Sequence, residues 1–297
     1  MVRAQTEDHR LELDGGRTVG YATWGDPEGT PVFFAHGTPG SRRNRHPSLD
    51  DPGWLRRQSL RFIGVDRPGY GYSDPRPEAT LLDCAEDVVR VADHLGVGRF
   101  CVVGASGGGP HAIALVASVP ERLRGVAVVS GVGMLDRPEA FEGMDEGNAA
   151  GFRMAIDSPE ELATALGDAA RTLREDSEGS LAGLAAGLPE VDRRCLEQAP
   201  DARALFVETF REAVRQGGTG WIDDRLRLVR PWPFRLEEIG GVEVRFHHGE
   251  ADVLVPAHHA KRLTEGIAGS RLRLYPGVRH LSIDDHVKEI VEDLPAP

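Results

Sequence analysis

A serine between glycines is the first residue in this sequence that could do chemistry. Ser106 stands in the segment Gly104-Ala105-Ser106-Gly107-Gly108, which directly follows a short apolar run. Gly-x-Ser-x-Gly between a strand and a helix is typical of a nucleophilic serine on a sharp turn. A phosphate-binding loop is the alternative, but its Gly-Lys-Ser/Thr ending and its Gly-x-Gly-x-x-Gly form are both missing here. We therefore predict that Ser106 is a nucleophile.

The nucleophile needs a base and an acid, and the sequence offers candidates for both. A serine hydroxyl attacks well only when a base removes its proton, and a carboxylate orients that base. His280 follows the last apolar run of the chain, directly before a helical pattern. Asp252 lies in the loop after the preceding apolar run, and Glu250 lies closer to the end of that run. We predict His280 as the base and Asp252 as the acid, with Glu250 as the alternative acid.

Acyl transfer also requires fixed donors for the oxyanion that develops in the transition state. The segment His36-Gly37-Thr38-Pro39-Gly40 follows an apolar run, where a loop beside the nucleophile can aim one backbone N–H inward. Gly107 directly follows Ser106, at the positive end of the expected helix. We predict that the backbone N–H groups of Thr38 and Gly107 form the oxyanion hole.

Short apolar runs that alternate with helical patterns must position these residues. Continuous apolarity is typical of strands covered on both faces, as in a parallel sheet. A hairpin over residues 10–24, with Asp14-Gly15-Gly16 at its turn, begins the sheet. Alternating strands and helices predict an α/β fold with a mostly parallel, doubly wound sheet. Its further strands are expected at Pro31–Ala35, Arg61–Val65, Phe100–Gly104, Gly125–Ser130, Val242–His247 and Arg271–Tyr275, and its helices at 81–95, Gly108–Val119, Ala257–Gly266 and Ser282–Leu294.

One long segment breaks this alternation. Residues 134–234 contain no convincing strand of a parallel sheet, but they include Ala-, Leu- and Glu-rich stretches such as Pro159–Leu173 and Asp201–Arg215. Such stretches indicate helices. We predict a core domain formed by residues 1–133 and 235–297, with a helical cap inserted at 134–234.

The motifs together resemble the α/β-hydrolase fold family, in its capped subgroup. The resemblance implies a triad in the chain order Ser106, Asp252, His280, and a cap that roofs the substrate pocket. Ser106 departs from the Asp nucleophile of epoxide hydrolases and haloalkane dehalogenases. Thr38-Pro39 and Asp66-Arg67-Pro68 depart from the usual pattern of prolyl iminopeptidases. The family motifs, in family order, are His36-Gly37-Thr38-Pro39-Gly40, Asp66-Arg67-Pro68-Gly69-Tyr70-Gly71-Tyr72-Ser73, Gly104-Ala105-Ser106-Gly107-Gly108, Gly249-Glu250-Ala251-Asp252 and Gly277-Val278-Arg279-His280.

Composition limits the partners of this chain. Its 297 residues carry 35 Lys and Arg against 47 Asp and Glu, a formal charge of −12, which disfavours nucleic acid and anionic membrane surfaces. The 3 cysteines are far apart, and no His or Cys spacing suggests a metal site. The polar N-terminus and the short apolar stretches indicate a cytoplasmic protein. We expect a small-molecule substrate, with no cofactor and no metal, and leave the oligomeric state open.

These residues predict a serine hydrolase that acts on an uncharged ester, lactone or amide through an acyl-enzyme. A cofactor-free lyase, cyclase or acyltransferase is an alternative, because one fold supports several kinds of carbonyl chemistry. A non-catalytic ligand receptor is another alternative, although a receptor has no need of a complete triad.

Other charged residues have structural interpretations. Arg42, Arg43, Arg45 and His46 could meet a substrate carboxylate, but a solvated basic loop that pairs with acidic cap residues is the favoured interpretation. Asp66 and Arg67 are adjacent in the sequence, and we expect them to pair and to hold the loop after their strand.

Overall fold

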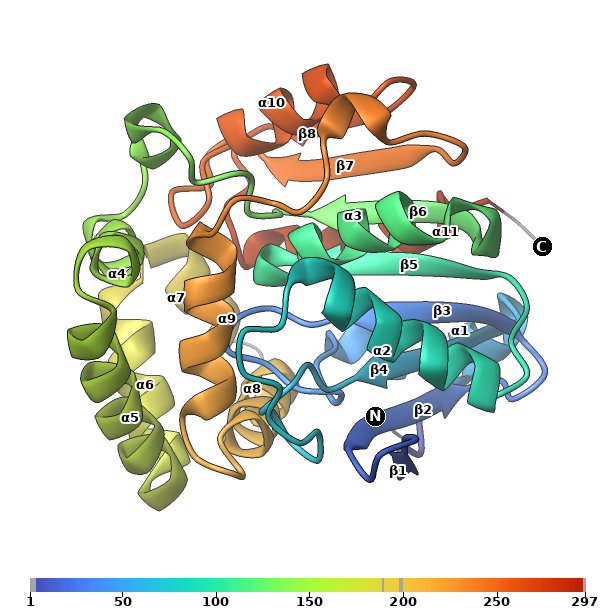
Figure 1. Ribbon diagram of the computed structural model, residues 1–297, viewed down its shortest axis with the longest axis horizontal. Coiled ribbons are helices and arrows are strands. Elements are labelled where there is room, and N and C mark those ends of the chain that lie inside the picture. The colour runs from blue at the N-terminus through green and yellow to red at the C-terminus, as the bar shows by residue number, and fades with distance from the viewer. Residues whose placement is uncertain (1–3, 189, 198–199, 296–297) are drawn as a thin grey trace.

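The strands of this protein form one mixed sheet. The computed structural model describes residues 4–188, 190–197 and 200–295, and within these ranges the sheet has eight strands in the order β1-β2-β4-β3-β5-β6-β7-β8 (Figure 1). The pairs β1 with β2 and β2 with β4 are antiparallel, and the pairs from β4 through β8 are parallel. The strands are β1 (Glu7–Glu12), β2 (Thr18–Gly25), β3 (Thr30–Ala35), β4 (Leu60–Val65), β5 (Phe100–Ala105), β6 (Leu123–Val129), β7 (Val244–Gly249) and β8 (Arg271–Tyr275).

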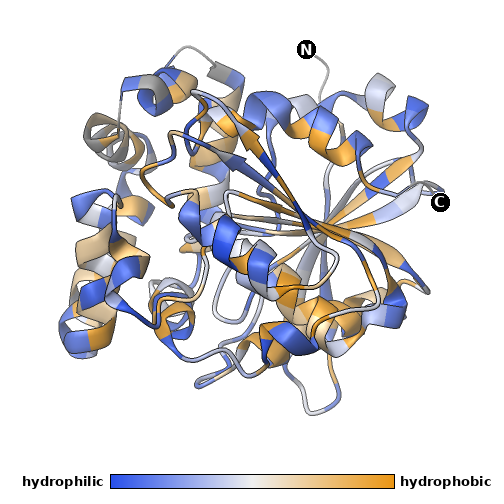
Figure 2. Ribbon diagram, turned by 90° about the horizontal axis from the view of Figure 1, so that it is seen from above, coloured by the Kyte–Doolittle hydropathy of each residue, from blue (hydrophilic) through white to orange (hydrophobic). Residues whose placement is uncertain are grey.

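Helices cover both faces of the sheet (Figure 2). Phe33 of β3 packs in one core with helices α2, α3 and α10, whereas the next residue, Phe34, packs in a second core with α1 and α11. This alternation explains why the strands are apolar without interruption, and the predicted doubly wound α/β fold is confirmed. The covering helices are α1 (Pro52–Arg57), α2 (Leu81–His94), α3 (Gly109–Ser118), α10 (His258–Gly266) and α11 (Val287–Glu292).

The final helix differs from its prediction. The segment Ser282–Leu294 was expected as one helix, but the structure has a 3-10 helix at Ser282–His286 and then α11. Such tighter turns are common at the ends of α-helices. The tighter turn begins two residues after His280, so it connects the predicted base to the helix that packs on the sheet.

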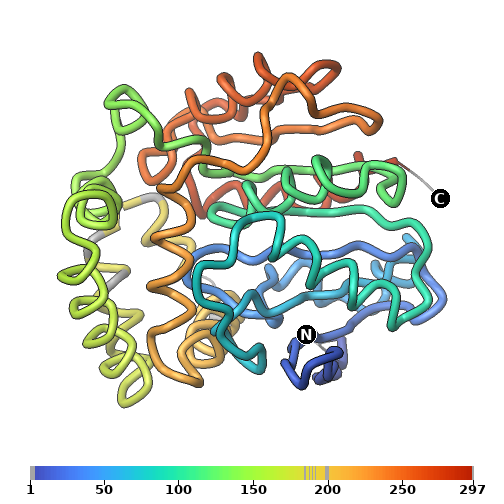
Figure 3. Tube along the Cα trace, in the orientation of Figure 1, coloured from blue at the N-terminus to red at the C-terminus, as the bar shows by residue number. Residues whose placement is uncertain are grey.

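A group of helices lies between β6 and β7 in the chain. Figure 3 shows the chain leaving the sheet after β6, forming a separate layer beside the strand ends, and returning at β7. The predicted helical insertion is therefore present, and its limits at 134 and 234 stay a prediction. None of the helices described is long and apolar enough to cross a membrane. The helices of this layer are α4 (Glu146–Asp157), α5 (Pro159–Glu175), α6 (Ser177–Gly187), α7 (Glu190–Glu197), α8 (Pro200–Ala213) and α9 (Thr219–Val229).

Candidate active site

Ser106 occupies a tight turn between β5 and α3. Its φ of 52° lies in the left-handed region, which residues other than glycine rarely adopt. The neighbouring glycines make the turn possible: a Cβ on Gly104 would lie 2.6 Å from the carbonyl oxygen of Gly108, and one on Gly108 would collide with the carbonyl oxygen of Ala35. The turn therefore requires the small residues of the motif and lifts the serine out of the strand.

Ser106, His280 and Asp252 form a continuous hydrogen-bonded chain. The Ser106 Oγ lies 3.1 Å from His280 Nε2, and His280 Nδ1 lies 2.7 Å from Asp252 Oδ2. The other carboxylate oxygen, Asp252 Oδ1, accepts the backbone N–H groups of Leu254 and Val255, at 2.9 Å each. A carboxylate held in this way fixes the imidazole so that Nδ1–H donates to Asp252 and Nε2 accepts the serine proton.

Glu250, the alternative acid, does not take part in this chain. Its side chain is exposed, and among the described residues His280 makes its carboxylate hydrogen bond to Asp252. The geometry therefore brings together the serine, the histidine and Asp252.

The electrostatics of the chain favour a charged imidazolium. Burial lowers the pKa of His280, but the charge and hydrogen bond of Asp252, with the nearby Asp192 and Asp284, outweigh it and raise the pKa above its ordinary value. Burial raises the pKa of Asp252, but His280 and His248 together hold it well below its usual range. A positively charged ring is the form that His280 adopts after it takes the serine proton, so these carboxylates stabilise the product of that step.

The two candidate oxyanion donors lie next to each other beside the serine. A Cβ on Gly107 would lie 3.4 Å from the backbone nitrogen of Thr38, and one on Gly37 would lie 3.6 Å from the Ser106 Cβ. Thr38, Ser106 and Gly107 line one cavity. The structure thus places Thr38 and Gly107 beside Ser106, and their role as oxyanion donors stays a prediction.

A buried carboxylate of the cap, Asp224 on α9, fastens the loop that carries Thr38, the candidate oxyanion loop. It is 0% exposed and accepts the Thr38 hydroxyl at 2.5 Å, Arg67 Nε at 3.0 Å and Arg67 Nη2 at 2.6 Å, and Arg227 Nη1 at 2.9 Å. Burial raises its pKa, but the charge of Arg67, together with a hydrogen bond from His111 and the charge of Arg227, holds that pKa well below the usual range. Sequence analysis missed this residue, because nothing in the local pattern of α9 indicates a partner 157 residues away.

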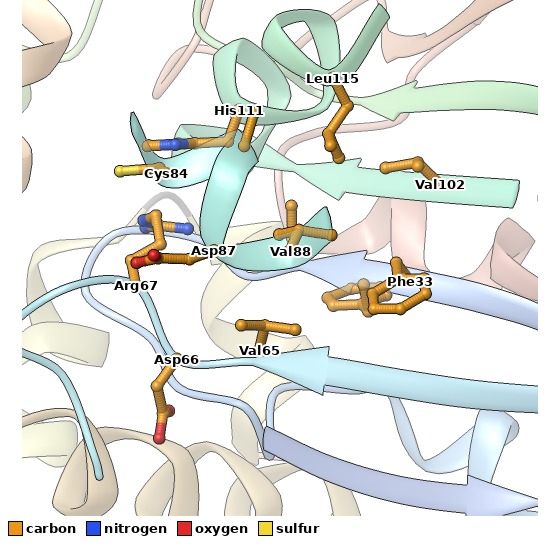
Figure 4. Close-up of a pocket in the computed structure, with 13 residues that line it drawn as sticks. Phe33, Val65, Asp66, Arg67, Cys84, Asp87, Val88, Val102, His111 and Leu115 are labelled. Atoms are coloured by element: carbon orange, nitrogen blue, oxygen red, sulfur yellow. The ribbon is translucent and has the colours of Figure 1, made fainter. Parts of the chain in front are cut away.

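The expected pairing of Asp66 with Arg67 is wrong. Arg67 pairs with Asp224, whereas Asp66 accepts the backbone N–H of Arg42 at 2.7 Å and its guanidinium at 2.8 Å. In Figure 4 the Asp66 carboxylate points away from the Arg67 guanidinium. Adjacent residues at the end of a strand project to opposite sides, so these two reach different partners.

The basic loop after Thr38 is also less solvated than expected. Arg42 is 0% exposed and forms ion pairs with Asp8, Asp66 and Glu212. Glu212 belongs to α8, so the predicted pairing with acidic cap residues is present for Arg42. Its burial is explained by the three carboxylates around it, because a buried guanidinium needs such partners.

Figure 4 shows a small cavity between α2, α3 and the sheet, with Arg67, Cys84, Asp87 and His111 on one side and apolar side chains on the other. Its volume of about 20 Å³ leaves no room for a substrate. Burial lowers the pKa of His111 to about 4, so its ring is neutral at physiological pH. This cavity belongs to the packing behind the oxyanion loop.

A second cavity, of about 880 Å³, opens onto the hydrogen-bonded chain and is roofed by the cap. A volume of this size suits a small organic substrate. Within the described residues, no three His, Cys, Asp or Glu side chains are grouped as ligands for a metal ion. The lining is mostly apolar and includes Phe34, Phe152, Leu173, Leu181, Leu196, Phe206, Phe210, Trp221 and Leu228, together with Ser106 and His280.

Known proteins resemble this chain over most of its length. A family model described as alpha/beta hydrolase fold matches residues 30–287. A proline iminopeptidase of Xanthomonas citri is 27% identical over 295 residues, which cover 92% of this chain and 90% of that protein. A proline iminopeptidase of Neisseria gonorrhoeae is 32% identical over 125 residues, 41% of this chain and only 38% of that protein. The solved structure of an esterase from Exiguobacterium antarcticum, 21% identical, matches 95% of this chain and 96% of its own with a TM-score of 0.65, a likeness of fold.

Proposed function

The chain belongs to the alpha/beta hydrolase fold family, and we propose that it is a serine hydrolase that cleaves a small ester, lactone or amide bond through an acyl-enzyme. The hydrogen-bonded chain of Ser106, His280 and Asp252, with its distances of 3.1 and 2.7 Å, carries this proposal. The relatives named proline iminopeptidase and the structurally similar esterase support the amide and ester members of the class.

The proposed reaction has two steps on the same residues. His280 Nε2 takes the proton of Ser106 as Oγ attacks the substrate carbonyl, and Asp252 stabilises the imidazolium. The N–H groups of Thr38 and Gly107 hold the oxyanion, and His280 then gives its proton to the leaving group. In the second step His280 activates a water, which releases the acid and restores the serine hydroxyl.

The experiment that tests the nucleophile is covalent labelling with a fluorophosphonate probe. The probe should label the protein at Ser106 and should fail to label Ser106→Ala. Ser130→Ala is the matched control, because Ser130 lines the same cavity but lies outside the hydrogen-bonded chain. A Ser106→Ala protein that is still labelled, or that still hydrolyses an ester as fast as wild type, would refute the assignment. A receptor that uses the pocket only for binding would not be labelled at all.

We further propose that the protein works in the cytoplasm on small molecules, without nucleic acid partners. The formal charge of −12 supports the absence of nucleic acid partners, because nucleic acid binding needs clustered positive charge.

A further inference from the structure

One cation in the cavity has no anion beside it. Arg225 of α9 lines the cavity that holds Ser106 and His280. Its Nη1 and Nη2 each donate to the amide oxygen of Asn148 on α4, at 3.1 Å. Its guanidinium lies 4.3 Å from the ring centre of Phe152. Among the described residues, no carboxylate lies within ion-pair distance of Arg225, whose polar partner is the neutral Asn148.

The other buried arginines near the site each have a carboxylate partner. Arg42 has three carboxylate partners, and Arg67 and Arg227 share Asp224. A guanidinium has five N–H donors, and Arg225 uses two of them on Asn148. Its remaining donors have no acceptor among the described residues, in a site where burial lowers its pKa. A half-buried cation that lines a cavity and has unused donors suits an anion that arrives with the ligand.

Asn148 fixes this guanidinium relative to the reacting groups. The Asn148 Nδ2 donates to the carbonyl oxygen of Leu254 at 2.7 Å, and the backbone N–H of Leu254 donates to Asp252 at 2.9 Å. The chain of hydrogen bonds thus runs from Arg225 through Asn148 to the loop of the acid. Arg225 has a defined position in the cavity even without an ionic partner.

The two carboxylates that line the cavity, Asp145 and Asp284, do not serve as ionic partners of Arg225. Asp145 caps the N-terminus of α4 by accepting the backbone N–H of Asn148 at 3.1 Å. Asp284 lies after His280 on the 3-10 helix, where burial raises its pKa. Within the described lining, Arg225 is the one arginine or lysine. Among the described lining residues, Arg225 is therefore the one permanently charged cation that an anionic ligand can meet.

We propose that Arg225, held by Asn148, binds a carboxylate of the substrate. The natural substrates would then be carboxylate-bearing esters, lactones or amides, in place of the uncharged ones that the sequence predicts. The planar guanidinium matches a carboxylate, which can accept two parallel N–H bonds from it. This inference rests on the proposed hydrolase function.

Two pairs of esters test the inference, each differing by one charge. Monomethyl adipate, compared with methyl hexanoate, places the charge on the acyl side, and 4-acetoxybenzoate, compared with the neutral 4-methylphenyl acetate, places it on the alcohol side. The readout is the ratio of kcat/KM for the charged ester over the neutral one. In wild type, at least one pair should favour the charged ester. Arg225→Gln should lower that ratio by at least about tenfold, equivalent to about 1.4 kcal/mol.

Two further variants make the result specific. Asn148→Asp places a carboxylate against Arg225 and should lower the ratio as Arg225→Gln does, although the arginine is kept. Arg230→Gln is the matched control: Arg230 ends the same helix, pairs with Glu78 outside the cavity, and should leave the ratio unchanged. Because the ratio compares two substrates of one variant, a partly unfolded preparation gives the same ratio as a fully folded one. If Arg225→Gln gives no folded protein, the ratio measured with Asn148→Asp tests the inference: a lowered ratio supports it, and an unchanged ratio overturns it.

The outcomes separate this inference from the proposed function. A wild-type protein that is labelled at Ser106 but prefers the neutral ester in both pairs overturns the inference alone. An unchanged ratio in Arg225→Gln overturns it as well. A protein that is neither labelled nor active on any of the four esters overturns the hydrolase function and the inference with it.

Discussion

Replacing Asp224 by Asn should both destabilise the protein and slow its chemistry. The substitution keeps the shape of the side chain but removes the charge that Arg67 and Arg227 share. Both guanidinium groups are buried, with side-chain exposures of 6% and 3%. Removing one partner of a buried ion pair costs about 3–5 kcal/mol, because the remaining charge is left uncompensated. We expect a loss of unfolding free energy in that range.

This free energy translates into a measurable shift of the melting temperature. An unfolding entropy of about 2.1 cal/mol/K per residue gives roughly 0.6 kcal/mol/K for 297 residues. The Tm of Asp224→Asn should therefore fall by about 5–8 °C. The Thr38 hydroxyl also loses its carboxylate acceptor. Since one oxyanion donor is worth about 10²–10³ in kcat, a displaced Thr38 amide should lower kcat by about ten- to a hundredfold, with a smaller change in KM.

The assay is differential scanning calorimetry together with steady-state kinetics on one ester. Asp223→Asn is the matched control, because Asp223 precedes Asp224 on α9 and its Oδ2 has no hydrogen-bond partner among the described residues. It should change stability by less than about 0.5 kcal/mol, or about 1 °C in Tm. An Asp224→Asn protein that melts within about 2 °C of wild type, or a control that loses as much, would refute the reasoning.

The hydrogen-bonded chain of Ser106, His280 and Asp252 leads to further predictions. Asp252→Asn should reduce kcat by orders of magnitude, up to about 10⁴, with little change in Tm, whereas Glu250→Gln should change kcat less than about tenfold. Steady-state kinetics of the two folded variants would check this. The reverse ranking would transfer the acid role to Glu250. His280 must be neutral to accept a proton, and its pKa is raised, so kcat/KM should fall with decreasing pH through a midpoint above 6.5. Asp192→Asn removes a negative charge that favours the protonated ring, so this midpoint should move to lower pH; a pH–rate profile with an unmoved midpoint would show that Asp192 does not act on His280.

Local patterns were sufficient to predict the sheet, and the family motifs indicated the three residues that the structure brings together at the candidate site. Each apolar run became a strand because both faces of the sheet are covered, and the turn at Ser106 is encoded by its glycines. The predicted start of α2 is also local: Thr80 and Asp83 cap the helix by reciprocal hydrogen bonds. Asp252 could be preferred over Glu250 from the family pattern, and the structure places Asp252 against His280.

The polar contacts of the cap could not be predicted in this way. Helical periodicity indicates which face of α9 is buried but not what that face meets. Asp224 reaches Arg67 across 157 residues, and Arg225 reaches Asn148 across 77. Such contacts depend on how the inserted helices dock on the sheet, which no local pattern records. Asp66 and Arg67 were wrongly expected to pair for a different reason: adjacent residues at the end of a strand project to opposite sides.

Two consecutive residues of α9 have different tasks, and this limits how the protein can be re-engineered. Asp224 is bound to the oxyanion loop, while Arg225 lines the cavity. A substitution that rotates or shifts α9 to suit a new substrate would also move Thr38, so activity would be lost together with the old preference. By contrast, α5 and α6 contribute Leu173 and Leu181 to the cavity and make none of the hydrogen bonds to Asp224 among the described residues. A library for new substrates should therefore vary α5 and α6 and leave α9 unchanged.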